Sequence, residues 1–519
     1  MIDPDPVGLR VICNLLESVA EEMGTTLERS GVSPNIKERL DHSCAIFDGN
    51  AELVAQAAHI PVHLGAMPIA VKEAARICPL ADGDIVLLND PRLGGTHLPD
   101  ITTVQAFRLD PSDEKPIAYL ATRAHHADVG GTIPGSMGIT RSLKEEGVVI
   151  SPTTWVQGGK RLLEIEDQLL KQMRNRPERI GDLLAQRAAL DVGSRGLHRI
   201  INRIGTADLQ DGFHRLQVAA DRHTRALLTS IPDGTYGAAD QLDGDGIEDS
   251  PLSIVVKIQI QDDQAVFDFT GTAKSCAGPL NCNEAVVIST IQYVIRSLAG
   301  EEIPSSGGTL RSVQVVIPRG SILDPPEGSP VAGGNVETSQ RLVDVLLLAL
   351  APALPHLIPA QSQGTMNNLV IGDEAGAYYE TIGGGCGGGP DRHGASGRHA
   401  HMTNTLNTPI ERLEHSLPVR VTKLGLRKGS GGDGIHRGGD GVIREYQLLE
   451  RMQVSILSER RVHPPSGIAG GEDGLQGNNT LLDDQGSHDL PGKWQGVIEK
   501  GAPIRIETPG GGGWGKAPD

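Results

Sequence analysis

The fold around the most informative part of this chain is decided by the stretch ITTVQAFR (101–108), DPSD (110–113) and IAYLAT (117–122). The two outer segments are rich in β-branched and aromatic residues, which favours strands, and the middle segment has turn-forming residues. The stretch therefore predicts an antiparallel hairpin. In such a hairpin the start of the first strand lies beside the end of the second.

Metal-binding side chains gather at the open end of this predicted hairpin. If Arg108 pairs near Ile117, the ladder places Asp100 beside His125. His97 lies three residues before Asp100, in a glycine-rich loop that leads into the first strand. We therefore expect two imidazoles and a carboxylate to converge at one end of a sheet.

This set of side chains predicts a site for a divalent metal. Imidazole nitrogens with one or two carboxylate oxygens suit Zn²⁺, Mn²⁺ or Fe²⁺, and without a thiolate the choice of metal stays open. A mixed site of this kind keeps a position for water, which a metal can activate near neutral pH. The alternative is that His125 and His126 are ordinary strand-end residues that hydrogen-bond to nearby aspartates.

Length and charge limit the class of protein. A chain of 519 residues has ample material for two or three hydrophobic cores. Its formal net charge of −18 makes nucleic acid and anionic membranes poor partners, because both require a basic face. No apolar run approaches the roughly 18 residues of a membrane span, and the N-terminus lacks the basic-then-apolar layout of a secretory signal. We therefore expect a cytoplasmic protein that binds neither nucleic acid nor membrane.

The usage of cysteine, aromatic residues and glycine is also informative. The 6 cysteines are scattered without C-x-x-C spacing, so neither a disulfide framework nor a thiolate metal site is predicted. Aromatic residues make up only 3% of the chain, whereas glycine occurs 66 times. This composition predicts many tight turns and backbone-lined loops rather than stacking platforms for bases.

The first 232 residues predict a sheet covered by helices. Apolar residues recur at every fourth position over 7–27, which indicates an amphipathic helix, and the pattern over 162–232 is largely helical. Taken alone, the charged stretch 35–43 is typical of a surface turn. His59 and His63 are four residues apart like half of a metal site, but without a neighbouring glutamate packing or substrate contact fits them better.

The rest of the chain predicts strands, two apolar helices and glycine-rich loops. Residues 253–270 are typical of a β-hairpin, 285–298 and 342–350 of helices, 313–317 of a strand, and 419–514 of short strands between glycine turns.

Two glycine-rich runs leave alternatives open. The run 383–390 could cup an anion with its backbone amides, or it could be a crossing loop where backbones touch. The run 508–515 is either a mobile tail or a tucked-in loop. The stretch 399–405 has side chains suited to a polar pocket.

These patterns together predict an α+β fold, with mixed sheets and helical layers in the N-terminal half and mainly strands in the C-terminal part. We predict a metal-binding α+β region over 1–232, a middle α/β region with the glycine-rich loop over 233–418, and a β-rich region over 419–519.

Several motifs occur in an order that resembles the hydantoinase B/oxoprolinase family. The resemblance covers nearly the whole chain, and its motifs are NIKERLDHS (35–43), NDP (89–91), GGTHLPD (94–100), RAHHADVGG (123–131), HMTNT (401–405) and PGGGGWG (509–515).

The resemblance implies a metal centre and a partner. It implies that a divalent metal, zinc in some members and manganese in others, is held by Asp41, His97, Asp100 and His125. The resemblance alone supplies Asp41. It also implies that ATP is bound by a hydantoinase A-type ATPase subunit, in a heterotetramer or a larger assembly. No nucleotide-binding fingerprint is visible in this sequence, in agreement with that division of labour.

The activity that the resemblance implies is ATP-dependent opening of a small cyclic amide, such as a hydantoin, 5-oxoproline or a lactam. Such amides resist hydrolysis because they are resonance-stabilised and unstrained. Phosphorylation of the carbonyl oxygen in the partner would give an activated imidate-like phosphate for this subunit to hydrolyse. We expect His126 and Asp128 either to transfer protons or to orient His125.

Two other functions fit parts of the same pattern. The family also contains acetone and acetophenone carboxylases, in which a phosphorylated enol would react with CO₂. A chain of this kind could also be a noncatalytic binding and assembly subunit, although residues that match all four ligand positions argue against that role.

Overall fold

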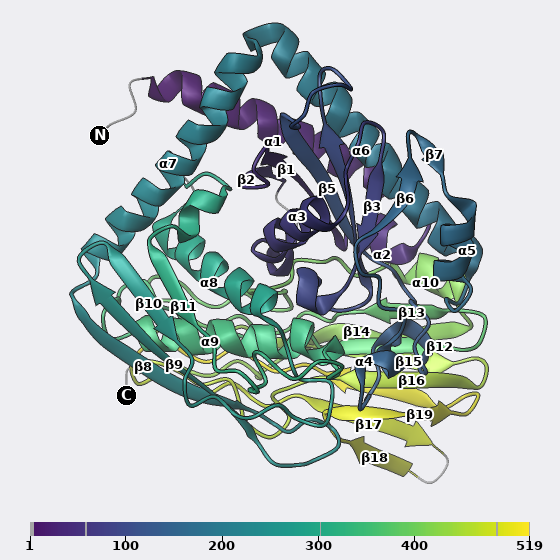
Figure 1. The fold of residues 1–519 in the computed structure, drawn as a ribbon. Coiled ribbons are helices and arrows are strands. Elements are labelled where there is room, and N and C mark those ends of the chain that lie inside the picture. Colours follow the sequence, from purple (N-terminus) through teal and green to yellow (C-terminus); the bar gives the residue numbers. More distant parts are fainter. Residues whose placement is uncertain (1–4, 58–59, 301–302, 484–485, 518–519) are drawn as a thin grey trace.

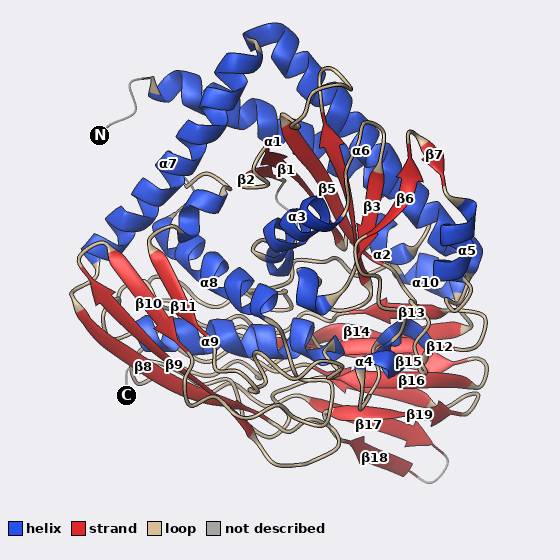
Figure 2. Ribbon diagram, viewed as in Figure 1, coloured by secondary structure: helices blue, strands red, loops and turns tan. Residues whose placement is uncertain are grey.

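The computed structural model describes residues 5–57, 60–300, 303–483 and 486–517. The strands form four sheets, and the helices pack mainly on the N-terminal sheets (Figure 2). This arrangement confirms the predicted α+β fold. Among the helices of these ranges, none is long and apolar enough to cross a membrane.

The first sheet is antiparallel throughout and contains the predicted hairpin. Its strand order is β2-β1-β5-β4-β3-β6-β7. The hairpin of β4 and β5 pairs Asp100 with His125 and Phe107 with Ala118, so the predicted register is confirmed. The strands are β1 (His42–Asp48), β2 (Leu53–Gln56), β3 (Ile85–Leu88), β4 (Asp100–Phe107), β5 (Ala118–His125), β6 (Thr153–Gln157) and β7 (Lys160–Arg161).

Helices cover both faces of this sheet, as Figure 1 shows. The helix α3 (Ala66–Ile77) packs on one face, in a cluster with Phe47 and Val86. The helices α1 (Pro6–Ser30) and α6 (Arg176–Ile204) pack on the other face. Since successive side chains of a strand alternate between faces, every strand residue is assigned to one of these two layers.

The helix α1 is confirmed, but the predicted apolar row is not the buried face at its N-terminal end. Val7 and Val11 are 74% and 45% exposed, whereas Leu9, Ile12 and Leu16 are buried. An α-helix has about 3.6 residues per turn, so a row of every fourth residue rotates around the helix. That row therefore coincides with the buried face only over the later turns.

The predicted helical region 162–232 is also confirmed. It consists of α5 (Leu163–Leu170), α6 and α7 (Thr206–Ser230), and the last two meet at the top of Figure 1 and diverge from there. The shorter helices in the molecule are α2 (Pro34–Lys37), α4 (Leu143–Glu146) and α10 (Ile410–Ser416).

The second sheet, of order β11-β10-β9-β8, lies under two apolar helices. The helix α9 (Ser339–Leu350) packs on β8 and β9, and α8 (Glu284–Ala299) packs on α9. The helix α9 is preceded by one π-helical turn, Gly334–Thr338. The strands are β8 (Gly234–Leu242), β9 (Leu252–Gln261), β10 (Gln264–Asp268) and β11 (Val313–Val316), which confirms the predicted hairpin and strand.

Two further sheets make the C-terminal part mainly β, as predicted. Their orders are β13-β12-β16-β19 and β14-β15-β20-β17-β18. The first of them joins strands from both sides of residue 418, and the three-domain division stays a prediction. The strands are β12 (Asn368–Gly372), β13 (Ala377–Glu380), β14 (Val419–Arg427), β15 (Gly441–Leu448), β16 (Met452–Leu457), β17 (Asn478–Asp483), β18 (Gly486–Leu490), β19 (Lys493–Ile498) and β20 (Pro503–Glu507).

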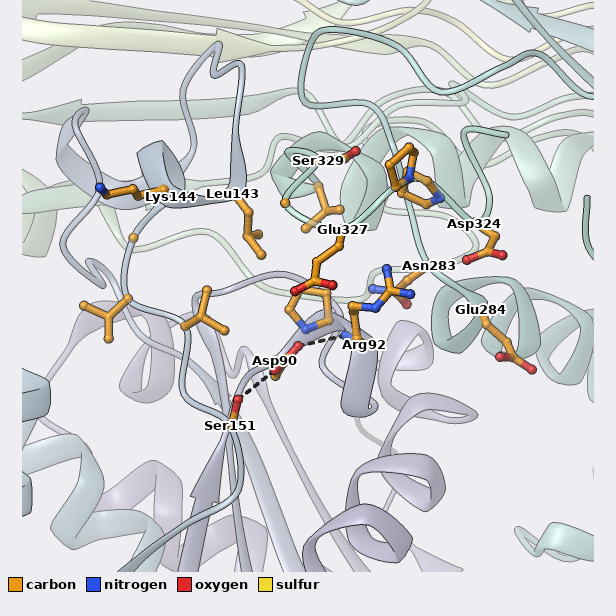
Figure 3. A pocket seen from close by; sticks show the side chains of 18 of the residues that line it. Asp90, Arg92, Leu143, Lys144, Ser151, Asn283, Glu284, Asp324, Glu327 and Ser329 are labelled. Carbon is orange, nitrogen blue, oxygen red and sulfur yellow. Dashed lines mark hydrogen bonds between the residues drawn. The ribbon is translucent and has the colours of Figure 1, made fainter. Parts of the chain in front are cut away.

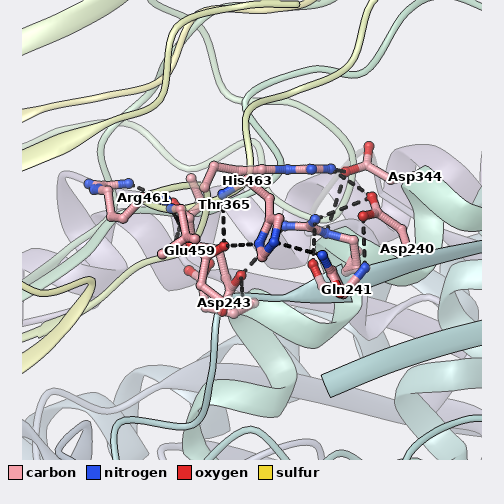
Figure 4. A network of polar contacts seen from close by, with 12 residues as sticks. Asp240, Gln241, Asp243, Asp344, Thr365, Glu459, Arg461 and His463 are labelled. Carbon is pink, nitrogen blue, oxygen red and sulfur yellow. Dashed lines mark hydrogen bonds and ion pairs between the residues drawn. The ribbon is translucent and has the colours of Figure 1, made fainter. Parts of the chain in front are cut away.

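A buried network of charged groups connects the second sheet, α9 and the C-terminal part (Figure 4). Arg460 lies 3.0 Å from Asp240 of β8 and 2.7 Å from Asp344 of α9, and Arg341 lies 3.2 Å from Asp240. Burial by itself raises the pKa of Asp240, but the two guanidinium groups lower it far below its ordinary value. Each of these buried charges is therefore compensated, as burial of ions requires.

The two glycine-rich runs meet in a place that we call the glycine crossing, formed by the segments 383–389, 430–439, 466–474 and 510–513. Their backbones hydrogen-bond directly, for example Gly388 N–H to the Gly512 carbonyl at 2.9 Å and Gly511 N–H to the Gly439 carbonyl at 3.0 Å. The amides of 384–389 all donate to protein acceptors. The structure therefore supports a crossing loop rather than an anion cup, and a tucked-in tail.

The glycine crossing leaves no room for side chains, which gives a direct test. In the variant Gly511→Ala the new Cβ would lie 2.0 Å from the carbonyl oxygen of Cys386. Because the obstacle is backbone, we expect a loss of about 2 kcal/mol or more in the free energy of unfolding. The control is Gly425→Ala in β14, where nothing lies within 4 Å of the position that a Cβ would take. Urea unfolding of both variants should separate them, and equal effects would contradict the steric explanation.

Candidate metal centre

Three neighbouring strands align candidate side chains in one row at one end of the first sheet. The register of β4 and β5 sets Asp100 opposite His125. The register of β1 and β5 sets His42 opposite Ala124, so Asp41, one residue earlier, lies beside His125. The amide of His125 donates to the Asp41 carbonyl at 3.0 Å. Asp41 therefore belongs to the row, although the local sequence pattern did not indicate it.

His97 reaches the same place from the loop before β4. The short 3₁₀ helix Pro91–Leu93 ends at Gly94, whose φ of 89° is the left-handed conformation that glycine adopts without strain. Nε2 of His97 lies 3.2 Å from Oδ1 of Asp100, and Nδ1 of His125 lies 3.4 Å from the same oxygen. The possible ligand atoms of these three residues all lie within 4.8 Å of one another.

The surroundings of these side chains fit a metal ion. Nε2 of His97 and Nε2 of His125 are buried and have no hydrogen-bond partner among the residues that the structure describes, which is costly for a buried polar atom. The side chains of His97 and His125 line a small cavity of about 20 Å³, large enough for an ion or one water. Two imidazoles and carboxylate oxygens are a donor set that zinc and manganese accept. The cavity is lined by Asp41, His63, His97, Asp100, His125, Asn335, Tyr379, Thr381, Met402 and Thr403, with Ile60, Val62, Val336 and Met366.

The other oxygen of Asp100 is held by three side chains. Oδ2 accepts from the hydroxyl of Thr96 at 2.5 Å and from Nδ2 of Asn335 at 3.4 Å, and it contacts Nε2 of His63 at 3.2 Å. The ring of His63 is fixed in turn by the hydroxyl of Ser43, 2.8 Å from Nδ1. The carboxylate is thus oriented so that Oδ1 remains for the histidines of the row.

The charge on Asp100 follows from the same contacts. Burial by itself raises the pKa of this carboxyl, but His97 and His63 lower it well below its ordinary value. An ionised carboxylate with both oxygens oriented is the form that binds a cation.

The tautomer of His97 is set by a backbone carbonyl. Nδ1 of His97 lies 3.3 Å from the carbonyl oxygen of Ala332, so Nδ1 carries the proton and donates it. The lone pair of Nε2 then points towards Asp100 and the cavity. Such a partner behind the imidazole is the usual way in which a metal-binding histidine is oriented.

The stretch 35–43 is mostly buried, with Lys37 exposed, so its interpretation as a surface turn is wrong. Arg39 is fully buried and Asp41 is only 7% exposed, because the C-terminal part of the chain covers them. Arg39 donates to the Tyr379 carbonyl at 3.0 Å and lies 3.6 Å from Asp41. The ring of Tyr379 stacks on His125 with centroids 4.5 Å apart. This cover keeps bulk water away from the row.

His126 and Asp128 are not brought together with the four other candidate residues. Since His125 faces α3, His126 turns to the opposite side, where its Nε2 lies 3.0 Å from Oε1 of Gln186 on α6. Burial lowers the pKa of His126 to about 4. Asp128 pairs with the guanidinium of Arg174 at 3.0 Å, and it accepts from the backbone amides of Gly130 and Gly135 in its own loop and of Arg174.

Three residues of the centre carried little or no local signal. His63 lies four residues after His59, which is outside the described residues, and its Nε2 contacts Asp100. Asn335 lies in the π-helical turn and Tyr379 on β13. Both are more than 200 positions from Asp100 and His125, and no periodicity links positions so far apart. Only the stretch 399–405 was indicated, as a polar pocket, and its Met402 and Thr403 line the cavity.

A larger cavity of about 720 Å³ lies next to the centre (Figure 3). Its walls include Arg92, Lys144, Asn283 and Glu327, and also Val331. The residue after Val331 is Ala332, whose carbonyl accepts the hydrogen bond from His97. A single stretch of backbone therefore borders both the large cavity and the centre.

Comparisons with known proteins identify relatives over the whole described chain. A family model described as hydantoinase B/oxoprolinase matches residues 5–517. The 5-oxoprolinase 1 of Arabidopsis thaliana is 40% identical over 537 residues, which cover 98% of this chain and 42% of that protein. The chain spans about two fifths of the length of the first curated relatives that it matches.

Two solved structures have the same fold. A crystal structure of an ATP-dependent caprolactamase from Pseudomonas jessenii superposes with a TM-score of 0.91 at 27% identity, covering 99% of this chain and 91% of that chain. A nucleotide-free acetone carboxylase superposes with a TM-score of 0.87 at 15% identity, covering 99% of this chain and 76% of that chain.

The geometry predicts the effect of Asp100→Asn on metal content. An amide in place of the carboxylate removes the negative charge between two histidines, so we expect the purified chain to retain less than about a tenth of the wild-type metal. The matched control is Asp84→Asn, a buried aspartate before β3 that accepts from Ala81 and Gly158 amides away from the row. Elemental analysis of both variants is the measurement, and full metal content in Asp100→Asn would refute the assignment.

Proposed function

This chain belongs to the hydantoinase B/oxoprolinase family, and from that membership we propose that it is the hydrolytic part of an ATP-dependent enzyme that opens a cyclic amide ring. The buried group of His97, Asp100 and His125 is the observation that carries the proposal. The relatives named 5-oxoprolinase and caprolactamase act, by their names, on cyclic amides.

We propose that His97, Asp100, His125 and Asp41 hold one divalent ion, zinc or manganese. When bound, the ion would supply Lewis-acid stabilisation for negative charge on oxygen. The protein residues supply the rest of the environment. Asp100 presents one oriented oxygen to the row, and Tyr379 excludes water beside His125. Arg39 lies 3.6 Å from Asp41 and balances its charge.

ATP has a chemical purpose in such a reaction. An unstrained cyclic amide is a poor electrophile because its nitrogen lone pair is delocalised onto the carbonyl oxygen. Transfer of a phosphoryl group to that oxygen would make the ring carbon more electrophilic. Addition of water to that carbon, followed by cleavage of the C–N bond with a proton transferred to the nitrogen, would open the ring and leave an acyl phosphate. A second water would hydrolyse the acyl phosphate to a carboxylate and inorganic phosphate. We propose that a hydantoinase A-type ATPase unit performs the transfer, in a heterotetramer or larger assembly. The Arabidopsis relative extends well beyond the part matched by this chain, which leaves room for such a unit.

We propose that His126 and Asp128 orient the centre rather than transfer protons. His126 holds the end of β5 through its amide, 2.9 Å from the Pro99 carbonyl, and through Gln186 on α6. Asp128 organises the loop that follows, by way of Arg174. Neither side chain is among those that line the small cavity.

The variant Asp128→Asn tests this role. The amide cannot accept all four hydrogen bonds that the carboxylate accepts, so we expect about tenfold weaker metal affinity and a matching loss of activity that excess metal restores. Titration with metal against a chelator, followed by an activity assay at saturating metal, is the measurement. Activity lost while metal affinity is unchanged would instead support a direct role in proton transfer.

The proposed activity is tested with the purified complex. The chain is co-expressed with a hydantoinase A-type subunit and supplied with ATP and one of 5-oxoproline, N-methylhydantoin, caprolactam or acetophenone. We expect ATP hydrolysis coupled to a product heavier than one cyclic amide by one water, as measured by mass spectrometry.

Labelled bicarbonate in the same assay tests the alternative function, which is carboxylation of a ketone. The acetone carboxylase shares the fold of this chain, whereas the more similar relatives are named as hydrolases. Label in the product of acetophenone, without ring opening of any amide, would make this chain part of a ketone carboxylase. Full activity of a complex that contains no metal and carries Asp100→Asn would make it an assembly subunit.

A further inference from the structure

Glu146, the last residue of the short helix α4, is a buried carboxylate that holds a distant backbone segment. It is only 1% exposed. Its Oε1 accepts from the amides of Val331 and Ala332, both at 2.9 Å, and from the hydroxyl of Thr140 at 3.0 Å. A side chain that gathers two consecutive amides fixes both the position and the direction of the backbone there.

The segment held in this way, residues 331–335, reaches two side chains of the candidate centre. The Ala332 carbonyl accepts the Nδ1 hydrogen of His97, as described above. Three residues later, Nδ2 of Asn335 donates to Oδ2 of Asp100 at 3.4 Å. We call residues 331–335 the acceptor segment, because its first contact with the centre is the carbonyl behind His97.

We propose that Glu146 is a positioning residue for the metal centre, acting through the acceptor segment on the tautomer and orientation of His97. This inference rests on the proposed role of His97 as a metal ligand. Glu146 itself touches none of the four proposed ligands.

The physical argument is one of hydrogen-bond geometry. Without Glu146 the amides of Val331 and Ala332 lose a buried acceptor, and the acceptor segment must move to satisfy them. The Ala332 carbonyl moves with it, so the Nδ1 hydrogen of His97 loses its partner. His97 then populates the other tautomer, in which Nε2 carries a proton and cannot bind a metal.

The location of the contact adds to this argument. Leu143 and Lys144 of α4 border the large cavity (Figure 3), and Val331 lines it too, while the next residue, Ala332, contacts the centre. The contact between Glu146 and the acceptor segment therefore stands between a cavity of about 720 Å³ and the buried row. If packing alone held the backbone between the cavity and the row, apolar side chains would be enough there. The Glu146 carboxylate, which accepts from two consecutive amides, instead fixes one position of that backbone.

Two conservative variants separate position from charge. Glu146→Gln keeps an oxygen at the same reach, and burial raises the pKa of the Glu146 carboxyl to about 7, so a neutral amide is a close substitute. Glu146→Asp keeps the charge but withdraws the oxygen by one methylene. The control is Glu166→Ala, which removes another buried glutamate. Glu166 accepts a hydrogen bond from Nε1 of Trp155 at 2.9 Å, and Trp155 lies on β6, beside the edge strand β7.

The full-length chain of each variant is titrated with Co²⁺, whose visible spectrum reports the ligand set, and with Zn²⁺ against a chelator. We expect Glu146→Asp to bind both ions about 10- to 100-fold more weakly, with an altered cobalt spectrum. We expect Glu146→Gln to remain within about threefold of wild type. Glu166→Ala should lose thermal stability while its metal affinity and cobalt spectrum stay unchanged.

Several outcomes would overturn the inference. Wild-type affinity in Glu146→Asp would show that the segment does not need this contact, and equal weakening in Glu166→Ala would show a general loss of stability. Weakening in Glu146→Gln but not in Glu146→Asp would show that charge matters rather than position. If the wild-type chain binds neither ion, the proposed metal centre fails, and this inference fails with it.

Discussion

The antiparallel register of β4 and β5 is the constraint on which the candidate centre depends. It brings Asp100 and His125 side by side on the face that α3 covers, and the pairing of β1 with β5 extends the row to Asp41. Side chains alternate along a strand, so a slip of one residue would turn one of the two to the opposite face. The apolar residues of β4 and β5 oppose that slip, because it would exchange the side chains that pack in the two buried layers. The fold and the centre are therefore stabilised by the same pairing.

How much of this could be predicted from the sequence depended on distance along the chain. The hairpin, its register, the helices after residue 162 and the strands after residue 419 follow from local periodicity and turn residues, and the structure confirms them. Asp41 and Arg39 look like residues of a surface turn, because what buries them is Tyr379, some 340 positions later. Asn335 and Tyr379 contact the row only after the two halves of the chain have packed, and no local pattern records that contact. The family resemblance supplied Asp41 because it compares whole chains rather than windows.

The polar interior of the centre is arranged so that its groups have defined orientations. Oδ2 of Asp100 is taken by Thr96, Asn335 and His63, and the Ala332 carbonyl takes Nδ1 of His97. Nε2 of His97 and Nε2 of His125 have no hydrogen-bond partner among the described residues, and both side chains line the small cavity. In a low-dielectric interior, polar atoms of this kind are unfavourable unless a ligand completes them. Arg341 and Arg460 pair with carboxylates of the protein, so the charge of that network is balanced by the chain itself.

The glycine crossing also limits the order in which the molecule can be assembled. Residues 510–513 lie between backbone segments that begin at 383, 430 and 466, and their amides and carbonyls complete the hydrogen bonds of those segments. During synthesis the earlier segments leave the ribosome first and have no partner for these groups. The hydrogen bonds of the glycine crossing therefore cannot be complete until residue 513 has emerged.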